Sequence, residues 1–166
     1  MNRIQRVRSL VDEIILKIED DEERRCAYVH LYGVSMACSL LAKKRKASVE
    51  LAVIAGMLHD IYSYCHMDSE DHAHKGAEMG LEILNSMDTF TQEEKNLICS
   101  AIWNHSDKSS VHGALDEILK DADVMQHCLY NPLSDVKGHE KKRFDSLKLE
   151  FGLDINDKCE SVSQGK

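Results

Sequence analysis

The chain has 166 residues, which is enough for one domain with a sizeable hydrophobic core. Proline occurs once and glycine eight times, a shortage of turn-forming residues that argues against an all-β fold and favours long helices. The net charge of -8 argues against non-specific binding to a nucleic-acid polymer or to an anionic membrane.

The first half of the chain predicts three helices. Apolar residues spaced three and four apart predict an amphipathic helix over residues 3–18. Asp20 can cap a second helix that runs to about residue 44, and Ser48 can cap a third over 49–60. This third segment is apolar nearly all round, so we expect it to be the central and most buried helix.

The second half continues the helical pattern between polar loops. We predict loops over 62–68 and 106–113, and helices over 71–87, 91–105 and 115–129. Thr91 with Glu94 fits a capping box that opens the 91–105 helix. A further short helix is expected over 138–149.

These elements together predict an all-α protein, a single-domain bundle of about six or seven helices. Neither an internal repeat nor a change in composition marks a domain boundary, so the domain is expected to span residues 1–150. Residues 151–166 are expected to form a frayed C-terminal tail.

Several features favour a cytoplasmic protein. The N-terminus lacks the apolar core of a signal peptide. The longest apolar run, residues 51–58, is far shorter than the ~20 residues of a membrane span. None of the six cysteines forms a C-x-x-C pair, so we expect reduced, mostly buried thiols rather than a zinc ribbon.

The dipeptide His59-Asp60 lies at the end of the most apolar helix. A buried aspartate is costly unless it is paired or bound to a metal. An imidazole beside a carboxylate makes a mixed nitrogen and oxygen site that suits zinc, manganese, iron, cobalt or nickel. A single His-Asp dipeptide occurs often by chance, so its companions decide how much it means.

Three further residues strengthen the metal-site interpretation. His30 lies on the small, apolar face of the second helix, and His105 lies on the apolar stripe of the 91–105 helix. Asp123 borders an otherwise apolar face of the 115–129 helix, and periodicity alone does not separate it from Asp121. Several buried imidazoles and carboxylates together need a shared partner.

These residues resemble the H…HD…D pattern of HD-domain metal-dependent phosphohydrolases. His30, His59-Asp60 and Asp123 match that pattern, and the segment AGMLHDI is similar to the apolar helix that ends in the HD pair. The segments DHAHKGA and IWNHS resemble the two blocks between. The likeness is strongest over residues 28–130, and it indicates a small single-domain member of the superfamily.

The resemblance implies a site with one or two divalent metal ions per chain, of iron, manganese, zinc, cobalt, nickel or magnesium. Asp123 is preferred over Asp121, and His72 over His74, because of the order and spacing of the family's blocks. Asp60 would bridge the two ions. The implied ligands are His30, His59, Asp60, His72, His105 and Asp123.

Residues that match no block receive weaker assignments. Lys108, in the 106–113 loop, is expected at the rim as a phosphate partner, so the expected catalytic set is Asp60, His72, His105 and Lys108. Lys75, Tyr62 and Tyr64 are weaker substrate candidates, and each is equally a surface or packing residue. We expect the remaining histidines to be solvated or in loops, namely His66, His74, His112, His127 and His139.

The resemblance implies a phosphohydrolase that cleaves a nucleotide or another small phosphate ester with a metal-held hydroxide. A metal-binding regulatory or ligand-sensing module without turnover is the alternative, and an oxygenase with two irons on the same scaffold is a third. The chain lacks the extra motif of the cyclic-di-GMP branch and the attached synthetase domain of the large alarmone enzymes. The expected partner is a small phosphorylated molecule, with no nucleic-acid polymer and no membrane.

Overall fold

A computed structural model describes residues 1–153 of the chain, and within that range it contains helices and no strand, which confirms the all-α prediction. The helices are α1 (Arg3–Ile15), α2 (Asp21–Lys44), α3 (Val49–Leu58), α4 (Ile61–His66), α5 (His72–Asn85), α6 (Gln92–Asn104), α7 (Ala114–Tyr130) and α8 (Lys141–Phe151).

The predicted N-terminal caps account for where three of the helices begin. The Asp20 carboxylate accepts hydrogen bonds from the second and third backbone N–H groups of α2. Ser48 caps α3 in the same way, accepting from the backbone N–H of its third residue. At α6 the Thr91 and Glu94 side chains form a reciprocal capping box. These caps fix where α2, α3 and α6 enter the bundle.

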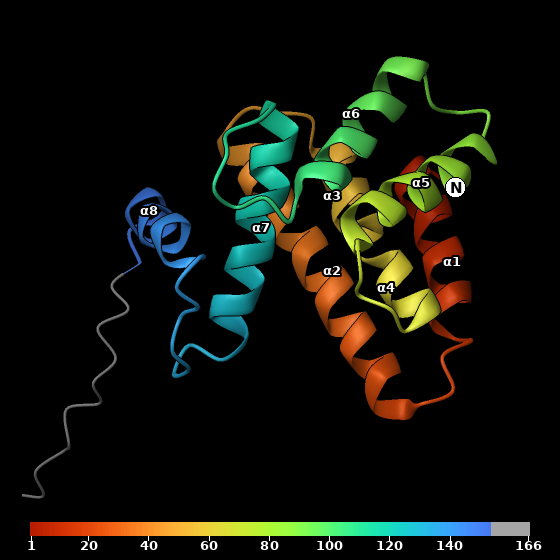
Figure 1. Cartoon of the computed structure of the whole chain (residues 1–166). Helices are drawn as coiled ribbons and strands as arrows, with labels where there is room; N and C mark the ends of the chain where they lie inside the picture. Colours follow the sequence, from red (N-terminus) through yellow and green to blue (C-terminus); the bar gives the residue numbers. More distant parts are fainter. Residues whose placement is uncertain (154–166) are drawn as a thin grey trace, which may run out of the picture.

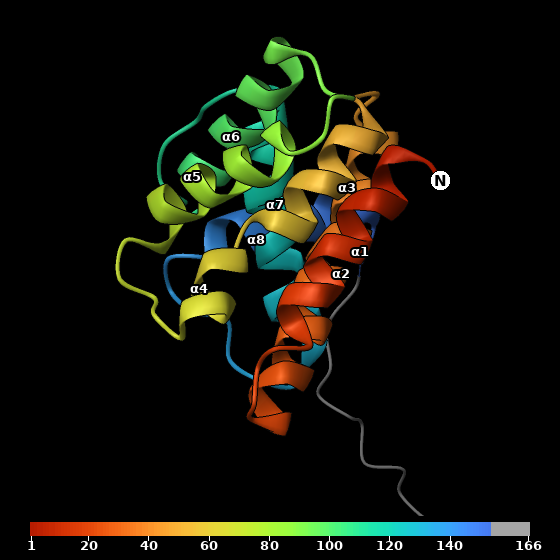
Figure 2. The ribbon, with the colours of Figure 1, turned by 90° about the vertical axis from the view of Figure 1, so that its right-hand side faces the viewer.

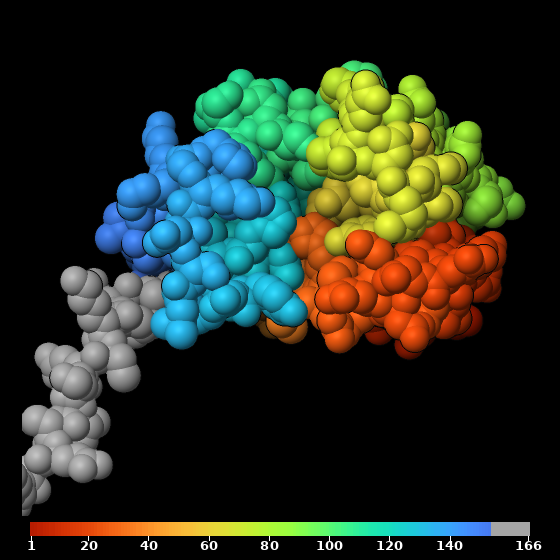
Figure 3. Space-filling model, turned by 60° about the horizontal axis from the view of Figure 1, so that its bottom comes forward, coloured from red at the N-terminus to blue at the C-terminus, as the bar shows by residue number. Residues whose placement is uncertain are grey.

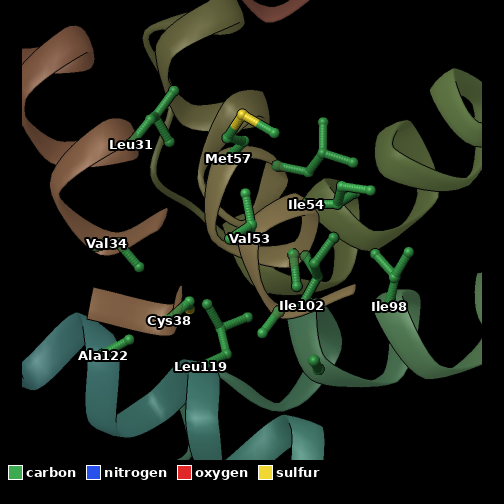
Figure 4. Close-up of a cluster of buried hydrophobic side chains, with 14 of the residues drawn as sticks. Leu31, Val34, Cys38, Val53, Ile54, Met57, Ile98, Ile102, Leu119 and Ala122 are labelled. Atoms are coloured by element: carbon green, nitrogen blue, oxygen red, sulfur yellow. The ribbon is translucent and has the colours of Figure 1, made fainter. Parts of the chain in front are cut away.

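Helix α3 is the centre of the bundle, as its composition predicts. All of its residues from Leu51 to Leu58 are buried, and α1, α2, α6 and α7 pack around it. The approach to α2 is close because a Cβ on Gly56 would lie 2.7 Å from the Cα of Ser35. The Ser35 hydroxyl also donates a hydrogen bond to the Val53 carbonyl at 3.0 Å. Figure 4 shows the core side chains that α2, α3, α6 and α7 contribute.

Helices α4 to α8 complete the bundle around α3. Helices α4, α5 and α6 follow one another on one side, and α7 with α8 covers the other, with α8 on the side of α7 away from α1 (Figures 1 and 2). In the space-filling view of Figure 3, the α4–α5 segment (yellow), α2 (orange) and the α7–α8 connection (cyan to blue) meet on one face. The C-terminal end of α3 therefore lies where segments far apart in the sequence converge.

The structure corrects several boundaries. The loop predicted over 62–68 contains the six-residue helix α4, because the short run after Asp60 continues the helical path for one and a half turns. Helix α1 ends at Ile15 instead of 18. Residues 154–166 of the predicted frayed tail lie outside the described residues.

Two further expectations concern cysteines and the membrane. Cys26 and Cys65 are exposed, contrary to the prediction of mostly buried thiols, whereas Cys38 and Cys128 are buried. Among the helices described in residues 1–153, none combines the length and the apolar character that a membrane crossing requires.

Candidate metal centre

The structure brings six predicted site residues together at the C-terminal end of α3. Asp60 joins the end of α3 to α4 and lies between histidines that arrive from different helices. Its side chain is 20% exposed, so the carboxylate is largely shielded from water. The surrounding residues are His30 from α2, His59 after α3, His72 at the start of α5, His105 at the end of α6 and Asp123 on α7.

One side of the centre combines two imidazoles with two carboxylates. The Nε2 atoms of His30 and His59 are 3.0 Å apart. Asp60 Oδ2 lies 3.3 Å from the His30 nitrogen and 3.6 Å from that of His59. Asp123 Oδ1 is 3.7 Å and 4.0 Å from the same two nitrogens. Four donor atoms, from α2, α7 and the two residues between α3 and α4, therefore face a common space.

The other oxygen of Asp60 faces a second pair of histidines. Asp60 Oδ1 is 3.2 Å from His105 Nε2 and 3.6 Å from His72 Nε2. The Ser106 hydroxyl lies 3.0 Å from the same His72 nitrogen and 3.3 Å from that of His105. The two oxygens of the Asp60 carboxylate thus face two separate pairs of histidines.

Each of these histidines is held by its other ring nitrogen. When Nδ1 donates its proton to a fixed acceptor, the Nε2 lone pair is left free and aimed at the centre. The acceptors are Gln126 Oε1 for His30 at 3.0 Å, Gly56 O for His59 at 2.9 Å, Ser69 O for His72 at 3.0 Å and Ile102 O for His105 at 2.7 Å. This orientation is the one that metal-binding imidazoles need.

The charges of the centre suit a bound cation. Burial would raise the pKa of Asp60, but the histidines around it hold that pKa well below its ordinary value. Burial also opposes ionisation of Asp123, yet Lys108 and the histidines keep its pKa low as well. In the described chain, Oδ1 of Asp60 and Oδ1 of Asp123 are buried without a hydrogen-bond partner. Two ionised carboxylates with free oxygens fit a bound metal ion.

The two closest imidazoles lead to the same requirement. Burial lowers the pKa of His59 to about 3, so that ring is neutral at neutral pH. Burial also acts to lower the pKa of His30, but hydrogen bonding to Asp60 and the charge of Asp123 raise it overall. Two inward nitrogens at 3.0 Å need a proton or a metal ion between them. The donor set of imidazole nitrogens and carboxylate oxygens fits a divalent transition metal.

The structure adds His127, which the sequence interpretation placed among the solvated histidines. His127 is exposed, as that interpretation expects, but its Nε2 lies 3.4 Å from Asp123 Oδ1, at the edge of the centre. Its ring stacks on that of His30 with centroids 5.2 Å apart. The sequence did carry a signal, since residues four apart on a helix share a face and His127 follows Asp123 by four.

Lys108 lies in the predicted loop, but the expected place on the rim is wrong. Its side chain is 8% exposed, and its ammonium group donates to Asp123 Oδ2 at 2.5 Å and to the His105 carbonyl at 2.8 Å. The side chain turns inward because the buried carboxylate offers a charged partner that the solvent-facing direction lacks.

The other candidates lie outside the centre. Asp121 pairs with Arg45 and Arg143, both at about 2.9 Å or less, and does not face the histidines. Lys75 pairs with Asp68 at 3.1 Å, and Tyr62 also reaches Asp68. Tyr64 packs near His30, with ring centroids 6.2 Å apart. His74 pairs with Asp71, and the remaining exposed histidines are His66, His112 and His139.

Two hollows give access to the centre from opposite groups of ligands. One of about 320 Å³ is lined by His30, Tyr64, His127 and other residues of α2 and α7. The second, of about 570 Å³, is lined by His72, Ser106 and neighbouring residues of α5 and α6. One hollow thus borders His30 and His127, and the other borders His72.

Comparison with known proteins agrees with this geometry. A family model described as "HD domain" matches residues 27–127, a segment that contains every residue placed in the centre above. No curated protein and no solved structure gives a significant match.

Proposed function

The chain belongs to the HD-domain superfamily of metal-dependent phosphohydrolases, and from this premise we propose that it hydrolyses a nucleotide or another small phosphate ester. The observation that carries the proposal is the carboxylate of Asp60, whose two oxygens face two separate groups of histidines. A carboxylate so placed can join two metal ions, which is the arrangement used for phosphate chemistry.

The residues divide between two metal positions. His30, His59, Asp60 and Asp123 would hold the first ion, and Asp60, His72 and His105 the second. When bound, divalent ions activate water and offset the charge of a phosphoryl group. Lys108 contacts Asp123 instead of the open hollows, so we assign it as a positioning residue that holds this ligand in place.

The proposal also explains how an acidic protein accepts an anionic substrate. The chain has a net charge of -8, but two divalent ions would outweigh the two buried carboxylates of the centre. The local field is then positive, although the surface as a whole is negative. The same acidic surface disfavours a nucleic-acid polymer or an anionic membrane as partner. Exposed Cys26 and Cys65 suit the reducing cytoplasm, where we place the protein.

The proposal is tested by metal analysis followed by a substrate panel. Protein purified without chelators should contain divalent metal and should release phosphate from at least one nucleotide or small phosphate ester under anaerobic conditions. Asp60→Asn protein with an unchanged circular dichroism spectrum should release none. Metal-loaded protein that binds but never hydrolyses panel members would point to the regulatory alternative. Activity that requires oxygen and iron would point to an oxygenase.

A further inference from the structure

His127 is the one histidine near the centre that the six-residue set leaves without a role. Its Nε2 atom faces Asp123 Oδ1 at 3.4 Å, and its ring stacks on His30. His30, Asp123 and His127 each offer one donor atom, and these atoms lie within 4.8 Å of one another. That spacing is compatible with ligands of a single ion.

The other ring nitrogen of His127 follows the pattern of the other inward histidines. Nδ1 lies 2.8 Å from Oε1 of Glu140, whose side chain is only 3% exposed. Glu140 directly precedes α8, so this helix supplies the acceptor that orients the ring. A buried carboxylate behind an imidazole is a typical support for a metal-binding histidine, because it fixes the tautomer and makes the ring a stronger ligand.

The two donor groups on this side of Asp60 must describe one metal position. His30 belongs to both, and it has only one inward nitrogen, because Gln126 occupies the other. One nitrogen lone pair binds one ion. We propose that the first metal position has five protein ligands, with His127 as the fifth beside His30, His59, Asp60 and Asp123. This inference rests on the metal centre of the proposed function.

Five ligands decide which class of metal fits. Zinc sites in proteins usually take four ligands in a tetrahedron, which three imidazoles and two carboxylates exceed. Six-coordinate ions such as Mn²⁺, Fe²⁺, Co²⁺ and Ni²⁺ accept the set and keep one position for water or substrate. The second position has only three protein ligands, so it is the more open of the two.

Cobalt provides a direct count of the histidines. The N–H protons of imidazoles bound to paramagnetic Co²⁺ appear far outside the usual range of a proton NMR spectrum. Wild-type protein with one equivalent of Co²⁺ should show three such exchangeable signals, from His30, His59 and His127. His127→Ala protein should lose one of them, and calorimetry should show the first Co²⁺ bound roughly tenfold or more weakly.

Two variants make the comparison specific. Glu140→Gln keeps the His127 ring but removes the charge behind it, and should weaken the first Co²⁺ by roughly tenfold. His139→Ala is the matched control, since His139 is exposed and also lies beside Glu140, at 3.9 Å, without facing the centre. It should bind Co²⁺ like the wild type.

The outcomes separate this inference from the proposed function. Two signals in the wild type, or unchanged Co²⁺ affinity in folded His127→Ala protein, would overturn the fifth ligand and leave the phosphohydrolase proposal intact. Failure of wild-type protein to bind Co²⁺, Mn²⁺ or Fe²⁺ at all would overturn both. The wild-type count decides the question even where a variant fails to fold.

Discussion

Gly76 on α5 passes directly over the backbone of His59. A Cβ built on Gly76 would lie 2.9 Å from the His59 carbonyl oxygen, closer than real Cβ atoms come to a backbone atom. The absence of a side chain at this position lets α5 approach the end of α3. The same approach brings His72, at the start of α5, within 3.6 Å of Asp60.

We therefore predict that Gly76→Ala destabilises the protein and weakens its metal site. The added methyl group must displace the backbone that carries His59, which typically costs about 1–3 kcal/mol. Gly80→Ala in the same helix is the control, because its Cβ would meet only the end of the Ile102 side chain. That variant should be neutral or more stable by up to ~1 kcal/mol, since alanine favours helix. Urea unfolding compares the two, and equal effects would contradict the argument.

The proposed bridging role of Asp60 predicts that Asp60→Asn protein binds neither metal ion. Asparagine has the same shape, but it lacks the negative charge that offsets the charge of two cations. Only the oxygen of its side-chain amide can bind a metal ion. Asp68→Asn removes a carboxylate from the nearby α4–α5 loop and should retain metal. Elemental analysis after purification without chelators measures the difference. Full metal content in Asp60→Asn protein would refute the assignment of Asp60.

The pair His72 and His105 allows the two positions to be separated. Alanine at both residues would remove two of the three ligands of the proposed second position and none of the first. The double variant should bind one ion per chain where the wild type should bind two, and its rate of phosphate release should fall to a small fraction of the wild-type rate. Calorimetric titration with Mn²⁺ gives the stoichiometry. A double variant that still binds two ions would show that the division is wrong.

The buried contact of Lys108 with Asp123 predicts a metal-dependent stability change. Lys108→Met leaves Asp123 without its ammonium partner, and breaking a buried pair in this way typically costs roughly 3–5 kcal/mol. A bound cation compensates, so the loss should be large in chelator and smaller with Mn²⁺. Urea unfolding in both conditions gives the comparison. An equal loss in the two conditions would mean that Asp123 does not bind the ion.

Acid should loosen the attachment of α8. Burial alone would raise the pKa of Glu117, but Arg143 lowers it overall, and hydrogen bonding to Arg45 lowers that of Glu150. A lowered pKa stabilises the fold at pH values above the ordinary value of 4.5, and this contribution is lost as the pH falls through the folded-state values. The free energy of unfolding should therefore decrease as the pH falls below about 4.5.

Arg143→Met identifies the α8 part of that pH dependence. Arg143 contacts Glu117 and Asp121, each at 2.9 Å, and donates to the Lys108 carbonyl at 2.8 Å. Without Arg143, Glu117 should titrate nearer its ordinary value. The free energy of unfolding should therefore change less between pH 5 and pH 3 than in the wild type. The difference between the two proteins should be on the order of 1.4 kcal/mol or less, which corresponds to one pKa unit. Identical dependence of the free energy of unfolding on pH in the two proteins would show that the contacts of Arg143 do not contribute to it.

The helices were predictable because their signals are local. A few neighbouring residues are enough to recognise the caps Asp20, Ser48 and Thr91 and the continuous apolar run of α3. Helix α4 was missed because six residues give too short a window for a period of 3.6 to be recognised. Its start at Ile61 depends on the backbone conformation of Asp60, which the sequence does not indicate.

The residues of the centre were predictable where they belong to a sequence motif. They were not predictable where their role depends on the direction in which the side chain points. His59 and Asp60 are adjacent in the sequence, so their proximity needed no fold. The inward turn of Lys108 depends on the position of Asp123 on another element, and loops carry no periodicity that would indicate it. His127 shares a face with Asp123, but only the position of Glu140, just before α8, shows which way its ring points.

The convergence of α2, the end of α3 and α7 on one point has a consequence for the lifetime of the protein. In the unfolded chain His30 and Asp123 are far apart, so a cation held between them would bind only the folded chain and would act as a reversible cross-link. The free metal concentration would then raise the folded fraction by mass action. Under metal limitation, proteases would remove this protein sooner, and its abundance would follow the metal supply.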